Sequence, residues 1–256
     1  MEYAGRGDPA RTTELLWRTA GAPRRGPKQR FTIDQVVDAA IAVADAGDVA
    51  ALSMRSVAQR LGVGTASLYT YLPGKAELLE LMVDRLAGAQ PLPDRGDDPR
   101  SALIDYATDD LDLLRGHPWV LQVATSREVL GPGVLARYEA AVGLLDGLGL
   151  TPRGTVEAVA ALDAYVRGAG AVVVEAEQAA SRTGRSDDEW WQARAPLLDE
   201  HFAAGRYPRL SALDAAGAFA PSRTDVPYTV QRALDRFDAG LALVLDGIEA
   251  AGSVDR

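Results

Sequence analysis

The sequence has no cysteine and only two histidines, His117 and His201, among its 256 residues. Without cysteine, the chain can form no disulfide and can offer no thiolate to a substrate or a metal. Two histidines and no cysteine also make a zinc site unexpected. We therefore expect neither a metal nor a cofactor, and a reducing compartment fits the composition.

Long apolar runs are also lacking, because no stretch of 18 or more apolar residues occurs. A membrane-spanning helix is therefore not expected. The first 20 residues have no apolar signal core, which predicts a cytoplasmic protein without a membrane partner. Strand-like alternation is nearly absent as well. The one β-branched run, GAVVVE at 170–175, lies inside a long helical pattern, so we predict an all-α fold.

Charge is distributed unevenly along a chain whose net charge is −9. Residues 1–75 contain ten basic and seven acidic residues, a net charge of +3, whereas the remainder contains 17 and 29, a net charge of −12. Five basic residues and no acidic residue lie between Arg18 and Arg30. This asymmetry indicates a polyanionic partner at one end of the molecule, although a solvated basic tail is an equal alternative.

Residues 1–30 are rich in Arg, Gly and Pro and are predicted to form a flexible basic arm. Within this arm, residues 12–18 are expected to form a helical turn that docks Leu15, Leu16 and Trp17. The arm could follow the minor groove of DNA or remain a disordered tail, and its composition does not decide between the two.

From Phe31 onward, apolar residues recur at helical spacing. Thr32 and Ser53 are the expected N-caps of the first two helices, which should end near Gly47 and Gly62. Two further helices are expected, from Thr65 to about Tyr71 and from Lys75 to Leu86. Residues 206–226 are predicted to be partly disordered. Longer helices are predicted over 101–115, 118–129, 133–148, 153–181, 187–205 and 227–251.

The segment LGVGTASLYTY, residues 61–71, has two glycines but lacks the preceding strand and the Gly-Lys-Ser/Thr end of a phosphate loop. Ala58, four residues before Gly62, is small enough to let a second helix pack closely. Gly62 can adopt the positive φ of a tight turn. The segment therefore predicts a helix-turn-helix, whose second helix can enter the major groove of DNA. The apolar positions that fix the angle between its helices are Val57, Leu61, Val63, Leu68 and Tyr71.

Residues 31–86 resemble the N-terminal domain of the TetR family of one-component transcriptional regulators. The elements LSMRSVAQRLGV, SLYTY and GKAELL all occur at the family's spacings. A weaker similarity to the tetracycline-repressor type of C-terminal domain occurs in HPWVLQVA and FDAGLALVLDGIEA. The resemblance implies a three-helix DNA-binding domain over residues 31–76 and a larger helical ligand-binding and dimerisation domain over 77–256.

The same resemblance implies a function. A homodimer would bind a palindromic operator in double-stranded DNA as a repressor, and a small, hydrophobic inducer would release it. Two alternatives remain open: an architectural DNA-binding protein without a ligand, and a small-molecule enzyme with a vestigial DNA-binding domain. The enzyme is the weaker alternative, because the sequence has no G-x-S-x-G motif and no metal-spaced histidines, and we expect no catalytic residue.

The DNA-binding residues should lie on the side of the second helix opposite Leu68 and Leu72. Arg55 suits a guanine or a phosphate, although an ion pair with Asp34 or Asp38 is the alternative. The resemblance assigns phosphate contacts to Tyr69 and Lys75. The expected DNA-binding residues are Arg55, Thr65, Ala66, Ser67, Tyr69, Thr70 and Lys75.

Two further sites are expected in the helical domain. The last predicted helix has apolar residues at alternating spacings of four and three, typical of a helix-packing seam, although this face could also belong to the protomer's own core. The expected dimer residues are Leu234, Phe237, Gly240, Leu241, Val244, Gly247 and Ile248. Polar or amphipathic residues within otherwise apolar helices could line a ligand pocket, or could be ordinary core and surface residues. The candidate ligand-binding residues are His117, Trp119, Gln122, Tyr138, Asp163, Tyr165 and Arg167. Trp190 and Trp191 could either pack or close the pocket.

Overall fold

The computed structural model describes residues 2–19, 30–93, 96, 98–124, 127–203, 205–220, 222 and 225–254. Within these residues there are eleven α-helices, two 3-10 helices and one pair of two-residue strands. The all-α prediction is therefore confirmed with one small exception. Among the described helices, none has the length and apolar character needed to cross a membrane. The chain divides into two compact units, residues 1–167 with 244–256 and residues 168–243.

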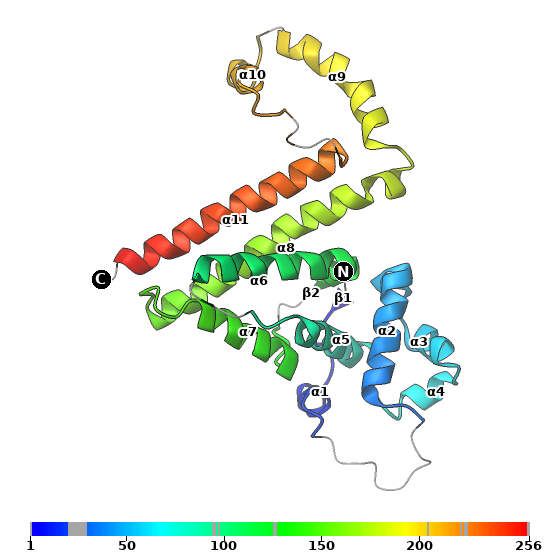
Figure 1. The fold of residues 1–256 in the computed structure, drawn as a ribbon. Coiled ribbons are helices and arrows are strands. Elements are labelled where there is room, and N and C mark those ends of the chain that lie inside the picture. The colour runs from blue at the N-terminus through cyan, green and yellow to red at the C-terminus, as the bar shows by residue number, and fades with distance from the viewer. Residues whose placement is uncertain are drawn as a thin grey trace. The chain divides into compact units, whose positions relative to one another are not determined.

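The first unit contains the helix-turn-helix. It is built from α2 (Ile33–Gly47), η1 (Val49–Ala51), α3 (Met54–Leu61) and α4 (Thr65–Leu68), which lie together in Figure 1. Both predicted N-caps are confirmed, because the Thr32 side chain accepts from the backbone of Gln35 and the Ser53 side chain from that of Ser56. Each pair forms a complete capping box, which satisfies two otherwise free N–H groups of its helix.

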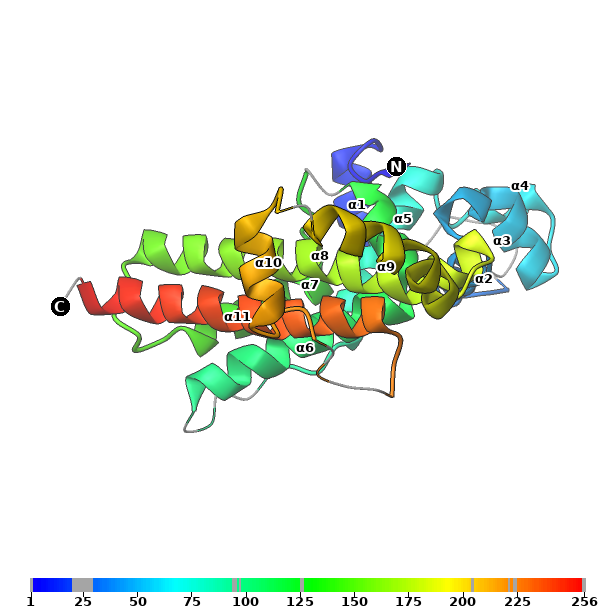
Figure 2. The same cartoon turned by 90° about the horizontal axis from the view of Figure 1, so that it is seen from above.

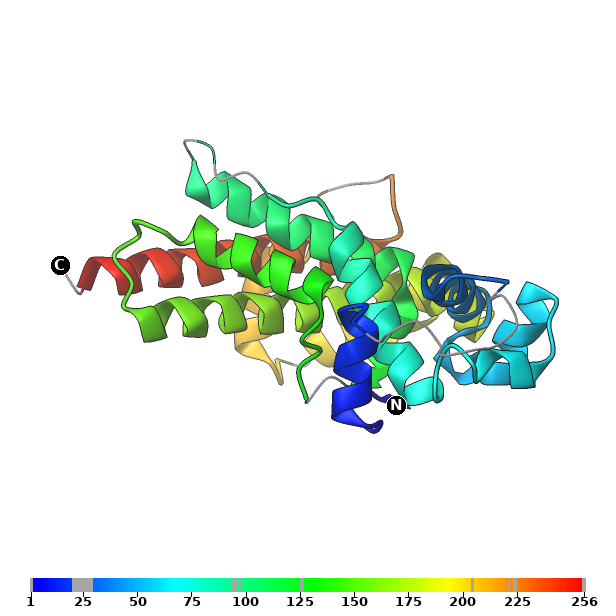
Figure 3. The ribbon, with the colours of Figure 1, turned by 90° about the horizontal axis from the view of Figure 1, so that it is seen from below.

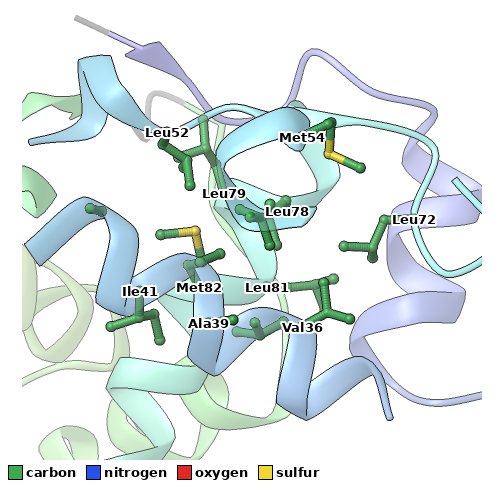
Figure 4. Close-up of a cluster of buried hydrophobic side chains, with 14 of the residues drawn as sticks. Val36, Ala39, Ile41, Leu52, Met54, Leu72, Leu78, Leu79, Leu81 and Met82 are labelled. Carbon is green, nitrogen blue, oxygen red and sulfur yellow. The ribbon is translucent and has the colours of Figure 1, made fainter. Parts of the chain in front are cut away.

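Helix α5 (Lys75–Ala89) packs on α2 on one side and on α7 (Pro132–Leu144) on the other. Figure 4 shows the buried cluster in which α2 and α5 meet, with Met54 and Leu72 completing it. Because α5 contacts helices on both sides of the predicted domain boundary at residues 76–77, it connects the helix-turn-helix to the rest of this unit. The boundary itself stays a prediction.

The N-terminal segment is folded, so the predicted flexible arm is wrong for residues 2–19. Strand β1 (Glu2–Tyr3) is followed by α1 (Pro9–Leu16), which packs on α5 and lies beside it in Figure 3. Leu15 and Leu16 are buried as expected, whereas Trp17 is exposed and its indole Nε1 donates to the carbonyl of Leu130 at 3.0 Å. The remainder of the predicted arm, residues 20–29, lies outside the described residues.

The predicted helix over 118–129 is also wrong. After α6 (Pro99–Gly116) the chain forms η2 (Pro118–Gln122) and then β2 (Val123–Ala124), which pairs in parallel with β1. Helical periodicity could not indicate this outcome, because the partner strand lies about 120 residues earlier in the chain. Two residues of backbone pairing here replace the helical hydrogen bonds.

Helices α5 and α7 approach each other through small residues. Gly88 and Gly133 face each other so closely that a Cβ on Gly133 would lie 2.2 Å from the carbonyl oxygen of Asp84. The Asp84 carboxylate in turn accepts from the backbone N–H of Val134 at 2.9 Å, near the start of α7. Burial raises the pKa of Asp84, and the hydrogen bonds from the backbone of α7 oppose that shift.

A buried polar cluster joins α6, α7 and the first half of α8. The Arg137 guanidinium donates to Asp110 Oδ1 at 2.9 Å and to the Tyr106 carbonyl at 2.9 Å, and it lies over the Tyr106 ring. Tyr106 in turn donates to Asp163 at 3.1 Å. Burial raises the pKa of Asp110 to about 6, and Arg137 opposes this shift. Burial raises the pKa of Asp163 as well.

The cluster predicts a specific dependence of stability on pH. Because the folded-state pKa of Asp110 lies above its ordinary value, the folded protein binds the proton more tightly than the unfolded chain does. The contribution of Asp110 to the free energy of unfolding should therefore fall as the pH rises from about 4 to about 6 and should level off above that range.

We expect Arg137→Met to lower the free energy of unfolding by about 3–5 kcal/mol at neutral pH, because it leaves buried carboxylates without a cation.

Urea unfolding between pH 4 and pH 8 measures both effects. Since Arg137 holds the pKa of Asp110 down, its loss should extend the decline to higher pH. Arg153→Met, which breaks only an exposed pair with Glu157, is the matched control and should leave the profile unchanged. Identical pH profiles for the two variants would contradict a coupled Arg137 cluster.

The second unit is formed by the later part of α8 (Pro152–Thr183), by α9 (Asp187–Ala203) and α10 (Pro208–Ala215), and by the first part of α11 (Tyr228–Val254). Figure 2 shows α8 and α11 as unbroken helices. The predicted helices over 153–181, 187–205 and 227–251 are close to α8, α9 and α11. The helix α10, however, lies where partial disorder was expected. The β-branched run at 170–175 lies inside α8, as predicted.

Candidate nucleic-acid interface

The turn between α3 and α4 has the geometry that the sequence predicts. Gly62 ends α3 in the left-handed region with a φ of 66°, and its N–H donates to the carbonyls of Ala58 and Gln59. Ala58 is buried, and α3 packs on α4. Nothing lies within 4 Å of a Cβ built on Gly62, so its backbone conformation, rather than space, is what favours glycine here.

Helix α4 and the turn that follows it, where a helix to about Tyr71 was predicted, are fixed by buried residues. Leu68 and Leu72 are fully buried, and the Tyr71 hydroxyl accepts from the N–H of Phe31 at 3.1 Å. Tyr71 is therefore a wedge that holds the helix in place. Tyr69, by contrast, is 56% exposed. The remaining expected DNA-binding residues of this segment have small side chains: Ala66, Ser67 and Thr70 are exposed, and Thr65 is half-buried.

Arg55 is exposed on α3, the helix that packs on α4. The alternative of an ion pair with Asp34 or Asp38 is wrong, because Arg18 pairs with Asp34 and Arg85 pairs with Asp38 at 3.1 Å. Among the described residues, no carboxylate lies within ion-pair distance of Arg55. Its guanidinium is thus available to a base edge or a phosphate.

Lys75, at the first position of α5, is not equally available. Its Nζ lies 3.0 Å from Glu2 Oε1 and donates to the carbonyl of Val49 at 3.3 Å. The side chain is about one-quarter exposed. The expected phosphate-binding lysine therefore already has an anionic partner in this structure, and that partner comes from the N-terminal strand.

The structure gives the polar groups of several candidate ligand-binding residues a protein partner. Asp45 Oδ1, on α2, accepts from the Trp119 indole at 2.7 Å and lies 2.8 Å from His117 Nδ1. Trp119 is fully buried. These two residues therefore connect the helix-turn-helix to η2, a structural role that does not require a ligand.

The other candidates differ in their partners and in their exposure to solvent. Arg167 Nη2 donates to the carbonyls of Val120, Leu121 and Val123, so it holds η2 and β2. Asp163 accepts from Tyr106 in the buried cluster. Tyr138 is exposed, and Gln122 and Tyr165 are half-buried. The assignment of the seven candidates to a ligand stays a prediction.

Two cavities adjoin each other within the second unit, between α8, the start of α9 and the start of α11. They measure about 430 and 410 Å³ and share Ala176, Ala179, Trp191 and Thr229. None of the seven candidate ligand-binding residues lines either one. Trp191 packs edge-to-face on Trp190 and on Tyr228, with ring centroids 4.8 and 5.2 Å away. The two tryptophans therefore form an aromatic wall.

The expected dimer face needs a correction. Phe237, Leu241 and Ile248 are only 2, 4 and 6% exposed in the single chain, so they belong to its core. Of the other expected residues, Leu234, Gly240 and Val244 are half-buried and Gly247 is exposed. The seam of alternating spacings marks the buried side of α11. The sequence could not distinguish this from a dimer face, because burial within a protomer and burial between protomers produce the same apolar pattern.

The exposed side of α11 has its own apolar stripe, Ala239, Leu243, Gly247 and Ala250. Leu243 is 72% exposed. Helix α8 has a similar stripe of exposed residues, Ala161, Ala164, Gly168 and Val172. Cβ atoms on Gly168 and Gly247 would meet nothing within 4 Å, so both positions are open to close helix approach. Leu243 could have been identified only by knowing which side of α11 faces inward.

Sequence reasoning also missed Asp45 and Glu2. Asp45 looks like an ordinary surface acid on α2, and its partners lie more than 70 residues away. Glu2 lies in a stretch predicted to be mobile. Neither residue belongs to a motif, so the sequence offers no local signal for its contacts.

Comparison with known proteins adds to this geometry. Residues 36–82 match the family described as bacterial regulatory proteins, tetR family, and residues 92–251 match the tetracyclin repressor-like C-terminal domain. The chain is 44% identical over 250 residues to the HTH-type transcriptional repressor DrrR1 of Streptomyces coeruleorubidus, covering 97% of this chain and 88% of that protein. It is 31% identical over 185 residues to an HTH-type transcriptional regulator of Saccharopolyspora erythraea, covering 71% and 77%.

Solved structures share the fold. Apo ActR from Streptomyces coelicolor matches with a TM-score of 0.67 at 24% identity, over 93% of this chain and all of that one. ActR in complex with actinorhodin matches with a TM-score of 0.67 at 25% identity, over 86% and 96%. The chain therefore belongs to the tetR family of bacterial regulatory proteins and is a transcriptional regulator that binds DNA.

Proposed function

We propose that this chain is a one-component repressor that binds a palindromic operator as a homodimer and leaves it when a small molecule binds its helical region. One observation carries the DNA-binding part of this proposal. Leu68 anchors a short helix whose other side chains are exposed or half-buried, and Arg55, on the adjoining helix α3, is exposed and has no ion-pair partner among the described residues. These groups have the chemistry to contact base edges and phosphates in a major groove.

A single α4 is too short to select an operator. Only four residues form the helix, so one copy reaches few base pairs. A two-fold dimer would place two copies about 34–36 Å apart, one helical turn of DNA. The exposed apolar stripes of α8 and α11 support such a dimer, because unpartnered Leu243 and Val172 side chains gain free energy when a second chain covers them.

The cavities of the second unit support the ligand part of the proposal. Their volumes lie in the range of small-molecule sites, and the walls are mostly apolar, with Trp190 and Trp191 as flat surfaces. A flat, largely apolar compound fits this chemistry, and ActR, a structural relative, has been solved with actinorhodin. The ligand can release the operator only if it binds the DNA-free state more tightly.

The test of the function is footprinting of the purified protein on its own upstream DNA, with and without flat aromatic compounds such as actinorhodin. We expect a two-fold symmetric footprint that at least one such compound removes. Equal affinity for random DNA would instead support an architectural protein. A footprint that no compound of this class changes would contradict the ligand-responsive part alone.

We expect Arg55→Ala to weaken operator binding by about 1–3 kcal/mol and to relax base preference at one position per half-site. Binding to operators with each single base change measures both effects. Arg153→Ala is the control, because it also removes one exposed guanidinium but lies on α8 and pairs with Glu157. A uniform loss over all sequences would mark Arg55 as a phosphate contact, and no loss would remove it from the interface.

A further inference from the structure

The contact between Lys75 and Glu2 is not required by anything proposed above. Lys75 is the lysine expected to bind operator phosphate, and its ammonium is 3.0 Å from a carboxylate oxygen of Glu2. A carboxylate and a phosphate compete for the same donors, because both are anionic oxygen acceptors. An ammonium has three donors, and the carbonyl of Val49 takes another. Glu2 and Val49 thus take two of the three donors, and the Glu2 carboxylate offsets the positive charge that would attract a phosphate.

Glu2 is held in this position by backbone contacts on both sides. As part of β1, it pairs with Val123 of β2, and the N–H of Ala4 donates to the carbonyl of Ala124 at 3.1 Å. The N–H of Gly5 donates to Glu80 on α5 at 2.9 Å. The N-terminal segment therefore joins the connector between α6 and α7 to the helix that begins with Lys75.

The same connector is held from two other helices. Asp45 of α2 binds Trp119 of η2, and Arg167 of α8 donates to three carbonyl groups of the connector, those of Val120, Leu121 and Val123. Strand β1 is two residues long and lies at an edge, so it can separate from β2 more easily than a helix can unfold. If Arg167 moves with α8, the strand β2 that it holds moves as well, and the pairing of β1 with β2 is disrupted first.

We propose that Glu2 is a positioning residue for Lys75: the N-terminal strand holds the Lys75 ammonium away from operator phosphate, and separation of β1 from β2 releases it. This inference rests on the proposed binding to an operator. Glu2 lowers operator affinity whenever β1 is paired. The pairing of β1 with the connector then determines whether the Lys75 ammonium contacts operator phosphate. The N-terminal segment, which belongs to the same unit as the helix-turn-helix, thereby lowers the affinity for DNA.

The test is Glu2→Gln, with the dissociation constant for the operator measured between 50 and 300 mM salt. We expect binding about two- to fivefold tighter, since one exposed ion pair no longer competes. The slope of log affinity against log salt should become steeper by about one, because one more phosphate contact releases a counterion. Glu14→Gln is the matched control, because this exposed acid on α1 pairs only with Arg11 in the described structure.

A Lys75→Gln background separates positioning from general charge. There, Glu2→Gln should change neither affinity nor slope. Equal tightening with and without Lys75 would overturn the proposal, since Glu2 would then merely repel DNA. An unchanged affinity and slope when Lys75→Gln is added to the Glu2→Gln protein would also overturn it, while leaving operator binding intact. Failure of the unaltered protein to footprint an operator would instead refute the proposed function.

Discussion

Replacing Leu243 with arginine is expected to convert the proposed dimer into monomers and to weaken operator binding by about 100-fold or more. Leu243 is 72% exposed on α11, at the centre of the stripe Ala239, Leu243, Gly247 and Ala250. In a dimer, an arginine at this position would bury a charge without a partner in both copies. The operator would then be bound by one half-site at a time, and the gain from linking two binding modules would be lost.

Light scattering and operator titration measure the two consequences of Leu243→Arg. The matched control is Leu92→Arg, because Leu92 is also exposed, at 61%, but follows α5 in a connector. We expect the control to keep the mass and the affinity of the unaltered protein. Thermal unfolding of Leu92→Arg should be close to that of the parent, since this side chain is largely in water, whereas Leu243→Arg should lose the stabilisation that dimerisation provides. A Leu243→Arg dimer of unchanged stability would show that this stripe is not the interface.

Gly133→Ala is expected to cost about 1–3 kcal/mol of unfolding free energy or more, because the added methyl group has no space. Its Cβ would lie 2.2 Å from the Asp84 carbonyl oxygen and 2.8 Å from the Gly88 nitrogen, both backbone atoms that cannot rotate away. Helices α5 and α7 would have to separate, and the hydrogen bond from Val134 to Asp84 would lengthen with them. Operator affinity should fall too, since α5 also supports α2.

Gly143→Ala, on the same helix α7, is the control. Nothing lies within 4 Å of its Cβ position, and the glycine is inside a helix. We expect this change to raise the unfolding free energy by about 0.5–1 kcal/mol, from helix propensity alone. We therefore expect urea unfolding to show changes of opposite sign in the unfolding free energies of Gly133→Ala and Gly143→Ala. A neutral Gly133→Ala would mean that α5 and α7 do not cross as closely as described.

The helix-turn-helix could be predicted from the sequence because its signals are local. Thr32 and Ser53 cap helices three residues ahead, and Gly62 closes a turn through bonds within four residues. Leu68 of α4 and Tyr71 of the following turn are buried, and the helix on which α4 packs precedes it by about ten residues. Interactions over such short separations are set by side-chain type and backbone conformation. The candidate DNA-binding face followed directly from them.

The wrong predictions, by contrast, concern segments whose structure depends on distant parts of the chain. Residues 118–129 have an acceptable helical pattern, yet β2 pairs with a strand near the N-terminus. Residues 2–19 have the composition of a mobile arm, yet β1 pairs with β2 and α1 packs on α5. In each case the deciding partner lies far away in the chain. Local propensity is a weak prior that such contacts override.

The sequence alone therefore determined most of the helices, the two N-caps, the DNA-binding turn and the family. Only the tertiary structure decided which side of α11 is core, which carboxylate holds Lys75 and where Asp45 acts. The physical reason is that an apolar pattern records burial without naming the surface that buries it. A charged side chain, likewise, records no partner until folding brings two distant segments together.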